Sequence, residues 1–145
     1  MIGRKIEQEL LQEAIDKDRA QFIVVYGRRR VGKTFLVNEF FQNKFAFKHT
    51  AVSPLNENLK PKRNLLKIQL KEFHYSLRSY GLQAGKPSPA DWFEAFHQLQ
   101  ELLDEKMEVE EPRVIFLDEL PWLDTPRSNF FATWLRIVAA STLLR

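Results

Sequence analysis

The sequence contains no cysteine among its 145 residues and has five glycines. Without cysteine, disulfide bonds, zinc sites built on thiolates and thiol nucleophiles are all excluded. The chain also lacks the continuous apolar run of about 18 residues that a membrane span needs, and residues 1–11 carry charges throughout, unlike a secretory signal. We therefore expect a protein of the reducing cytoplasm that has no membrane partner.

Neither sign of charge dominates the chain. Its 22 basic and 19 acidic residues give a net charge of +3, which permits binding to polyanions but does not imply it. One basic run could contact a nucleic-acid backbone, although a solvated helix face explains it more simply. This run comprises Lys60, Lys62, Arg63, Lys67 and Lys71. Nucleic acid is therefore not an expected partner of this segment, and the three histidines lack the spacing of metal ligands.

Apolar periodicity predicts alternating helices and strands. Helices are expected over residues 4–20, 32–43, 61–80, 88–103 and from 125 onward, and strands over 22–26, 45–50 and 114–117. This alternation predicts one α/β domain with three layers, in which helices cover both faces of a parallel sheet. The first helix should pack an apolar stripe on the sheet, and the second should bury its own apolar residues. The first set is Ile6, Leu10, Leu11, Ala14 and Ile15, and the second is Phe35, Leu36, Phe40 and Phe41.

The clearest motif joins the first expected strand to the second expected helix. The eight residues that follow the apolar run 22–26 fit the pattern G-x-x-x-x-G-K-[ST]. They are Gly27, Arg28, Arg29, Arg30, Val31, Gly32, Lys33 and Thr34. A loop that wraps phosphate with backbone N–H groups needs glycine where the backbone takes a positive φ or touches the ligand. An accidental glycine turn before a helix is the alternative, and the preceding strand argues against it.

The end of this loop carries side chains suited to a phosphate chain. Lys33 would reach the β- and γ-phosphates, and Thr34 would offer its hydroxyl to Mg²⁺ where the positive end of the helix dipole faces the anion. Phe35 follows directly and completes the candidate nucleotide-binding residues. The arginines at 28–30 could touch phosphates, but the middle of such a loop supplies mainly backbone groups, so solvated side chains are the preferred interpretation.

A second candidate site lies at the end of the expected strand 114–117. This apolar run ends in Asp118 and Glu119, and the carboxyl ends of parallel strands form the edge where ligands bind in α/β sheets. Asp118 would hold Mg²⁺ through a water molecule, and Glu119 would orient or deprotonate the water that attacks the γ-phosphate. A solvated strand end would explain the two acids alone, but the phosphate loop upstream favours the catalytic interpretation.

Together these motifs resemble those of the archaeal-type ATPases of prokaryotes, P-loop proteins similar to AAA+ and signal-transduction ATPases. The resemblance covers roughly residues 2–130 and is carried by Ile2-Gly3-Arg4, Val25–Thr34, Ser53-Pro54-Leu55, Asp91–Phe96 and Leu117–Pro126. It implies a P-loop NTPase fold, ATP with Mg²⁺ as ligand, and a Walker A loop that contains Lys33. It also implies that Asp118 and Glu119 are the Walker B pair, with Lys33 and Glu119 catalytic. Arg4 would lie near the adenine side of the site.

Residues 131–145 no longer resemble that family. We expect residues 1–145 to be the N-terminal part of an ATPase domain that has its first three strands and stops before a strand with a polar sensor residue. The family places this fourth strand between the first and third, so its absence would leave unpaired sheet edges, open to a protein partner or to a second copy of the chain. The leading hypothesis is Mg²⁺-dependent ATP hydrolysis. The alternatives are a nucleotide-dependent switch or scaffold without turnover, and a truncated, inactive remnant.

Overall fold

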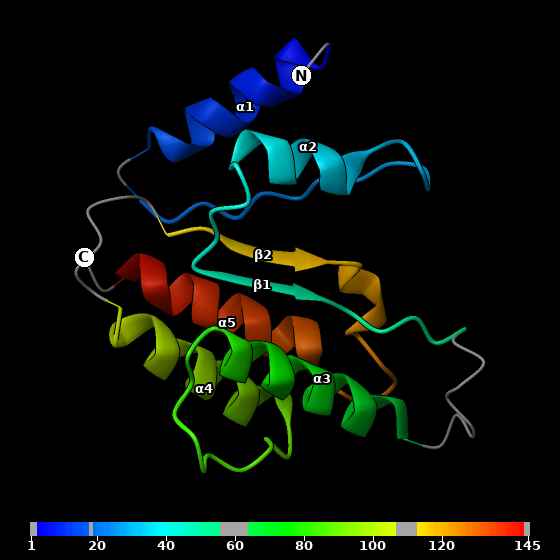
Figure 1. The fold of residues 1–145 in the computed structure, drawn as a ribbon, viewed down its shortest axis with the longest axis vertical. Helices are drawn as coiled ribbons and strands as arrows, with labels where there is room; N and C mark the ends of the chain where they lie inside the picture. Colours follow the sequence, from blue (N-terminus) through cyan, green and yellow to red (C-terminus); the bar gives the residue numbers. More distant parts are fainter. Residues whose placement is uncertain (1–2, 18, 56–63, 107–112, 144–145) are drawn as a thin grey trace.

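A computed structural model describes residues 3–17, 19–55, 64–106 and 113–143 of the chain. Its elements follow one another as α1 (Lys5–Ile15), α2 (Lys33–Phe40), β1 (Phe47–Thr50), α3 (Leu65–Ser79), α4 (Trp92–Asp104), β2 (Ile115–Asp118), the short 3₁₀ helix η2 (Leu120–Trp122) and α5 (Phe130–Leu143). Figure 1 shows the two strands in the middle, with α2 above them and α3, α4 and α5 below them. Helices therefore flank a small sheet on both sides.

The sheet consists of β1 and β2, which pair in parallel. Phe47 lies opposite Ile115, and Thr50 lies opposite Asp118. Parallel neighbours need a crossover connection, and α3 and α4 lie in the chain between these two strands. The strands expected over residues 45–50 and 114–117 are thereby confirmed, although β1 begins at Phe47 and β2 runs from Ile115 to Asp118.

The strand expected over residues 22–26 is not part of this sheet. Within the described part of the chain, the backbone groups of these residues make no hydrogen bond. Their side chains are exposed, from 37% for Val25 to 89% for Tyr26. A strand exists through its hydrogen-bonded ladder to a neighbour, and the described residues supply no such neighbour here. The prediction of three strands is therefore wrong in its first strand.

Helix α1 is shorter than expected and does not pack on the sheet. It covers Lys5–Ile15 rather than residues 4–20, and Figure 1 shows α2 between α1 and the two strands. Leu11 is buried, but Ile6 and Leu10 are 71% and 60% exposed. The apolar stripe is present in the sequence, yet such a stripe is buried only where another element covers it. The described elements do not cover these two residues, so their predicted burial is wrong.

Left-handed backbone conformations determine two helix ends that the sequence placed elsewhere. α2 ends at Phe40 rather than near residue 43, because Gln42 has a φ of 52°. α5 begins at Phe130 rather than at residue 125, because Arg127 has a φ of 62°. An L-residue in this conformation cannot continue a right-handed helix.

The main core lies between the sheet and helices α3, α4 and α5. Phe73 of α3 is fully buried, and the centroid of its ring lies 5.2 Å from that of Phe47 on β1 and 5.3 Å from that of Trp92 on α4. The ring of Phe130 on α5 lies 4.9 Å from that of Trp92. These edge-to-face contacts join all three helices to β1, which in turn supports β2. None of the helices in the described ranges has the length and apolar character that a membrane crossing requires.

Candidate functional site

The glycine-rich loop forms a turn directly before α2. Gly27 has a φ of 149°, and Gly32, the residue that precedes α2, has a φ of 78°. A Cβ on Gly27 would lie 3.7 Å from Val31 Cγ2, which is an ordinary contact. The backbone conformation, rather than lack of space, therefore calls for glycine at these two positions.

Lys33, the first residue of α2, turns its side chain back over the loop. Its Nζ donates hydrogen bonds to the carbonyl oxygen of Gly27 at 2.9 Å and to that of Arg28 at 2.8 Å. The ammonium group is therefore held at the loop, beside the N-terminus of an eight-residue helix. An anion at this place would be stabilised by both the lysine charge and the helix dipole.

Thr34 and Asp118 meet across the site, although 84 positions separate them in the chain. Thr34 Oγ1 donates a hydrogen bond to Asp118 Oδ2 at 2.9 Å, and both residues are half-buried. A hydroxyl and a carboxylate are the hard oxygen ligands that Mg²⁺ prefers, and Mg²⁺ commonly takes one or two protein carboxylates together with substrate phosphates. The described residues contain no cluster of three or more metal-binding side chains. Because both side chains offer oxygen ligands, they suit a metal that a phosphate ligand also binds.

Glu119 follows Asp118 in a left-handed conformation, with a φ of 54°. Its backbone N–H donates to Asp118 Oδ1 at 3.0 Å, and its side chain is exposed. A non-glycine residue in this region carries a cost of about 1–2 kcal/mol, and such strain gathers at functional sites. At this turn the chain leaves β2 after Asp118 and enters η2 at Leu120, so Glu119 is not part of the strand.

The remaining predicted site residues lie on the outside of the loop or of α2. The arginines at 28–30 and Val31 are exposed, which agrees with solvated arginine side chains. Phe35 is 57% exposed, so its expected burial in the second helix is wrong, because it lies on the face of α2 that no described element covers. Arg4 reaches the loop: its Nη2 donates a hydrogen bond to the carbonyl oxygen of Val31.

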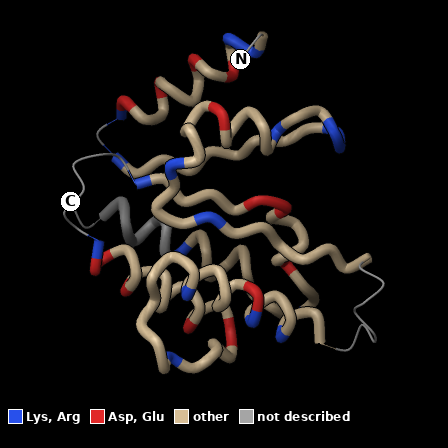
Figure 2. Tube along the Cα trace, in the orientation of Figure 1, with Lys and Arg blue, Asp and Glu red and all other residues tan. Residues whose placement is uncertain are grey.

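The charges around this site are arranged with opposite signs at one end of the sheet. Figure 2 shows Lys and Arg gathered at the loop before α2, and Asp and Glu at the end of β2, on the same side of the view. The basic run on the third expected helix is separate: Lys67 and Lys71 are exposed on α3, and residues 60–63 lie outside the described residues. The polar edge therefore combines a cationic loop with an acidic strand end.

Gln69 is a positioning residue that the sequence analysis missed. It is buried on α3, where its Oε1 accepts a hydrogen bond from Val52 N at 3.1 Å and its Nε2 donates to Val52 O at 2.8 Å. This amide fixes the segment that follows β1, at the same end of the sheet as Asp118. The available signal was a glutamine four residues before Phe73, on the apolar side of the helix.

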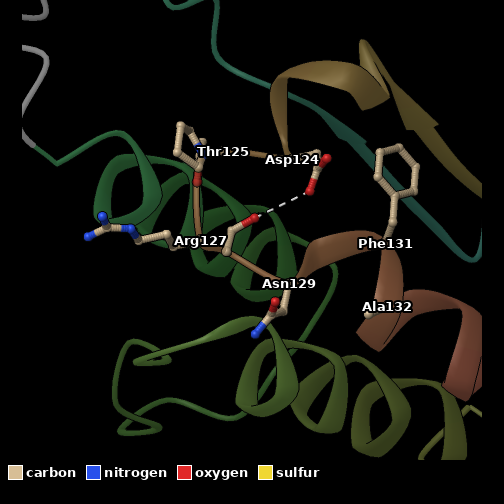
Figure 3. Close-up of a pocket in the computed structure, with 8 residues that line it drawn as sticks. Asp124, Thr125, Arg127, Asn129, Phe131 and Ala132 are labelled. Atoms are coloured by element: carbon tan, nitrogen blue, oxygen red, sulfur yellow. Dashed lines mark hydrogen bonds between the residues drawn. The ribbon is translucent and has the colours of Figure 1, made fainter.

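Two other polar features lie away from the loop. His49 on β1 is buried, accepts or donates one hydrogen bond with Ser76 Oγ at 2.8 Å, and has its pKa lowered to about 4 by burial. An open hollow of about 440 Å³ is lined by residues 124–129, 131 and 132, and Figure 3 shows these side chains around the turn before α5. No residue that the sequence predicted for phosphate or metal binding lines this hollow.

A glycine-rich phosphate-binding loop, the helix that follows it and a parallel strand that ends in acidic residues define the class of P-loop nucleotide-binding proteins. Residues 1–144 match the family described as AAA ATPase domain, and the chain belongs to that family. This match extends past residue 130, where the resemblance based on motifs ended.

Two archaeal relatives are similar to the chain. A protein of Methanocaldococcus jannaschii named as an uncharacterized ATP-binding protein is 46% identical over 43 residues, which is 30% of this chain and 73% of the relative. An uncharacterized protein of the same organism is 29% identical over 138 residues, which is 94% of this chain. The chain spans 26% of the length of that second relative. No solved structure matches the chain.

Proposed function

We propose that the chain binds ATP together with Mg²⁺ between the loop at residues 27–34 and the end of β2. The AAA ATPase family and the printed name of one relative support ATP binding in general. The observation that carries the proposal to particular residues is the hydrogen bond of 2.9 Å between Thr34 and Asp118. It joins the last residue of the loop motif to the acid of the strand, as a shared metal would require.

Each residue of the site has a role in this proposal. The backbone N–H groups of the loop cradle the phosphates, and Lys33 neutralises charge on the β- and γ-phosphates. Thr34 and Asp118 would hold Mg²⁺, which when bound neutralises charge on the phosphates. Glu119 orients the water for attack on the γ-phosphate, so that hydrolysis depends on positioning rather than on a covalent intermediate.

Titration calorimetry with Mg-ATP tests the binding site. Lys33→Ala should lose about 1.5–3 kcal/mol of binding free energy, because a charge-assisted contact to phosphate is removed. Lys86→Ala is the matched control, since Lys86 pairs with Glu101 at 2.6 Å and belongs to neither the loop nor the strand end. Equal affinity of Lys33→Ala and wild type would show that the loop is not the site.

Release of inorganic phosphate tests the catalytic part of the proposal. Glu119→Gln should bind ATP like the wild type and lose phosphate release, because the amide cannot take a proton from water. Glu105→Gln, which changes another exposed acid, should keep phosphate release. If wild type and Glu119→Gln release phosphate at the same rate, the chain is not a hydrolase that uses this residue.

The exposed apolar run 22–26 favours a second candidate function, that of a nucleotide-dependent switch or scaffold. Five adjacent apolar residues are exposed here, and their backbone groups have no hydrogen-bond partner among the described residues. Monomeric proteins rarely expose such a surface. A protein partner or a second copy would cover it, and the run leads directly into the loop. Light scattering with and without Mg-ATP tests this role through a nucleotide-dependent change of mass. Broad melting that Mg-ATP does not alter would instead identify an inactive remnant.

A further inference from the structure

The contact between Arg4 and the loop begins with an unusual turn at the start of α1. Gly3 has a φ of 88°, and Arg4 has a φ of 58° and a ψ of 35°, so two successive residues are left-handed. Gln8 stabilises this turn, because its Nε2 donates to Gly3 O at 3.1 Å and its backbone N–H donates to Arg4 O at 3.1 Å. The turn fixes the direction in which the Arg4 side chain leaves the helix.

The Arg4 side chain reaches the junction between the loop and α2. Its Nη2 donates to the carbonyl oxygen of Val31, 27 positions away in the chain. A Cβ placed on Gly32 would lie 3.9 Å from the same Nη2. The guanidinium therefore lies against the peptide group that links Val31 to Gly32, immediately before Lys33.

Holding that carbonyl also orients a hydrogen-bond donor. The C=O of Val31 and the N–H of Gly32 belong to one planar trans peptide group, in which they point in opposite directions. With the carbonyl directed at the guanidinium, the Gly32 N–H points away from Arg4. A free peptide group in a glycine-containing loop could rotate and lose this orientation, because glycine accepts many backbone conformations.

We infer that Arg4 is a positioning residue, which fixes the Val31–Gly32 peptide so that the Gly32 N–H is oriented to donate to a phosphate. This inference rests on the proposed function of the loop. It differs from the role that the family resemblance implies, because the contact on Arg4 is with the loop backbone and not with a base-binding surface. Arg4 therefore acts on any ligand that carries the phosphate chain, whatever its base.

Binding of Mg-ATP and of Mg-tripolyphosphate to the whole chain distinguishes these two roles. Arg4→Met, which keeps most of the side-chain length, should weaken both ligands by the same factor of about ten, the equivalent of one charge-assisted hydrogen bond. Arg4→Lys, which restores one donor, should recover part of the loss for both ligands. Arg19→Met, which removes an exposed arginine outside the site, should bind both ligands like the wild type. A loss confined to ATP, or no loss with either ligand, would overturn the inference.

¹⁵N relaxation of the ligand-free chain separates positioning from general destabilisation. Arg4→Met should lower the backbone order parameters of Val31 and Gly32 and leave those of α3 and α4 unchanged. Lower order parameters throughout the chain, or unchanged values at the loop, would contradict the inference. If the wild type binds neither ligand, the proposed function fails, but the order parameters at the loop still report whether Arg4 holds the Val31–Gly32 peptide.

Discussion

Removing the hydrogen bond between Thr34 and Asp118 should loosen the loop from the strand end even without nucleotide. The bond is 2.9 Å long, and both partners are half-buried. Thr34→Val removes the hydroxyl and keeps the branched shape, while Asp118→Asn removes the negative charge and keeps the size. The two single variants and the double variant complete a cycle that isolates the energy of this one interaction.

We expect a coupling energy of about 1–2 kcal/mol in the free energy of unfolding. A hydrogen bond to a charged acceptor contributes about 1.5–3 kcal/mol, and partial exposure of the pair to solvent reduces that value. The other carboxylate oxygen, Asp118 Oδ1, accepts from Glu119 N at 3.0 Å. Thr34→Val leaves this second bond in place, so the cycle reports the link to the loop rather than the turn after β2.

Urea unfolding of the four proteins measures this coupling, and the chain offers a matched control. Ser128 Oγ donates to Asp124 Oδ1 at 3.5 Å, a longer bond of the same chemistry at the turn before α5 (Figure 3). The cycle of Ser128→Ala and Asp124→Asn should give a coupling below about 0.5 kcal/mol. With Mg-ATP, Thr34→Val and Asp118→Asn should each lose most of the gain in ATP affinity that Mg²⁺ provides, while Asp124→Asn should keep it.

Equal coupling energies for the two pairs would refute the argument that the Thr34–Asp118 hydrogen bond links the loop to the strand end more strongly than an ordinary long hydrogen bond would. A Mg²⁺-dependent gain in ATP affinity that survives in Asp118→Asn would refute the assignment of the metal ligands. The two results are independent, because the first is measured without any ligand.

Three further predictions test the structure that supports the site. In urea unfolding, Phe73→Ala should cost about 3–5 kcal/mol because its ring is fully buried, while Phe93→Ala, at 59% exposure, should stay within about 0.5 kcal/mol of wild type. Burial lowers the pKa of His49 in the folded chain from 6.5 to about 4. As the pH falls, His49 is therefore protonated in the unfolded chain at a higher pH than in the folded chain. Stability should therefore fall by about 3 kcal/mol as the pH drops from 6.5 to 4 and stay level above 6.5. An equally steep profile in His49→Leu would contradict this origin. Asp91→Ala should lower the melting temperature, at a cost of about 1 kcal/mol, because Asp91 Oδ1 accepts from Glu94 N at 2.8 Å and caps α4.

The sequence predicted those parts of the fold whose signals are local. β2 lies along a short apolar run, and β1 has its two buried residues, Phe47 and His49, at alternate positions. The α4 pattern places buried and exposed positions with helical spacing. The run 22–26 has the same local signal, but a strand also needs a neighbour, and no sequence window contains that information. The ends of α2 and α5 were missed because non-glycine residues such as Gln42 and Arg127 adopt positive φ values there.

The candidate site divides in the same way. Gly27 and Gly32 could be placed from spacing alone, because the motif specifies where the backbone must turn. The approach of Thr34 to Asp118 could be predicted because ligands bind where parallel strands end, and the structure brings these two residues together. The contact of Arg4 with Val31 depends on how α1 lies relative to the loop, and amphipathic spacing carries no information on that placement.

Within the residues that the structure describes, residues 22–26 form no strand ladder, so other contacts hold the loop in place. In the described residues, α2 is joined to the sheet by side chains: Thr34 bonds to Asp118 on β2, and Asn38 Oδ1 accepts from Lys48 Nζ on β1 at 2.9 Å. Leu36 and Val37 are buried on the same helix. The distance between the loop and the acidic strand end is therefore set by the packing of α2 and by these two polar contacts, rather than by backbone pairing of the segment before the loop. When a metal bound with a ligand takes the place of the Thr34–Asp118 hydrogen bond, the bond between Lys48 and Asn38 is not affected. The position of α2 on the sheet can therefore be kept while Thr34 and Asp118 exchange their hydrogen bond for contacts with the metal.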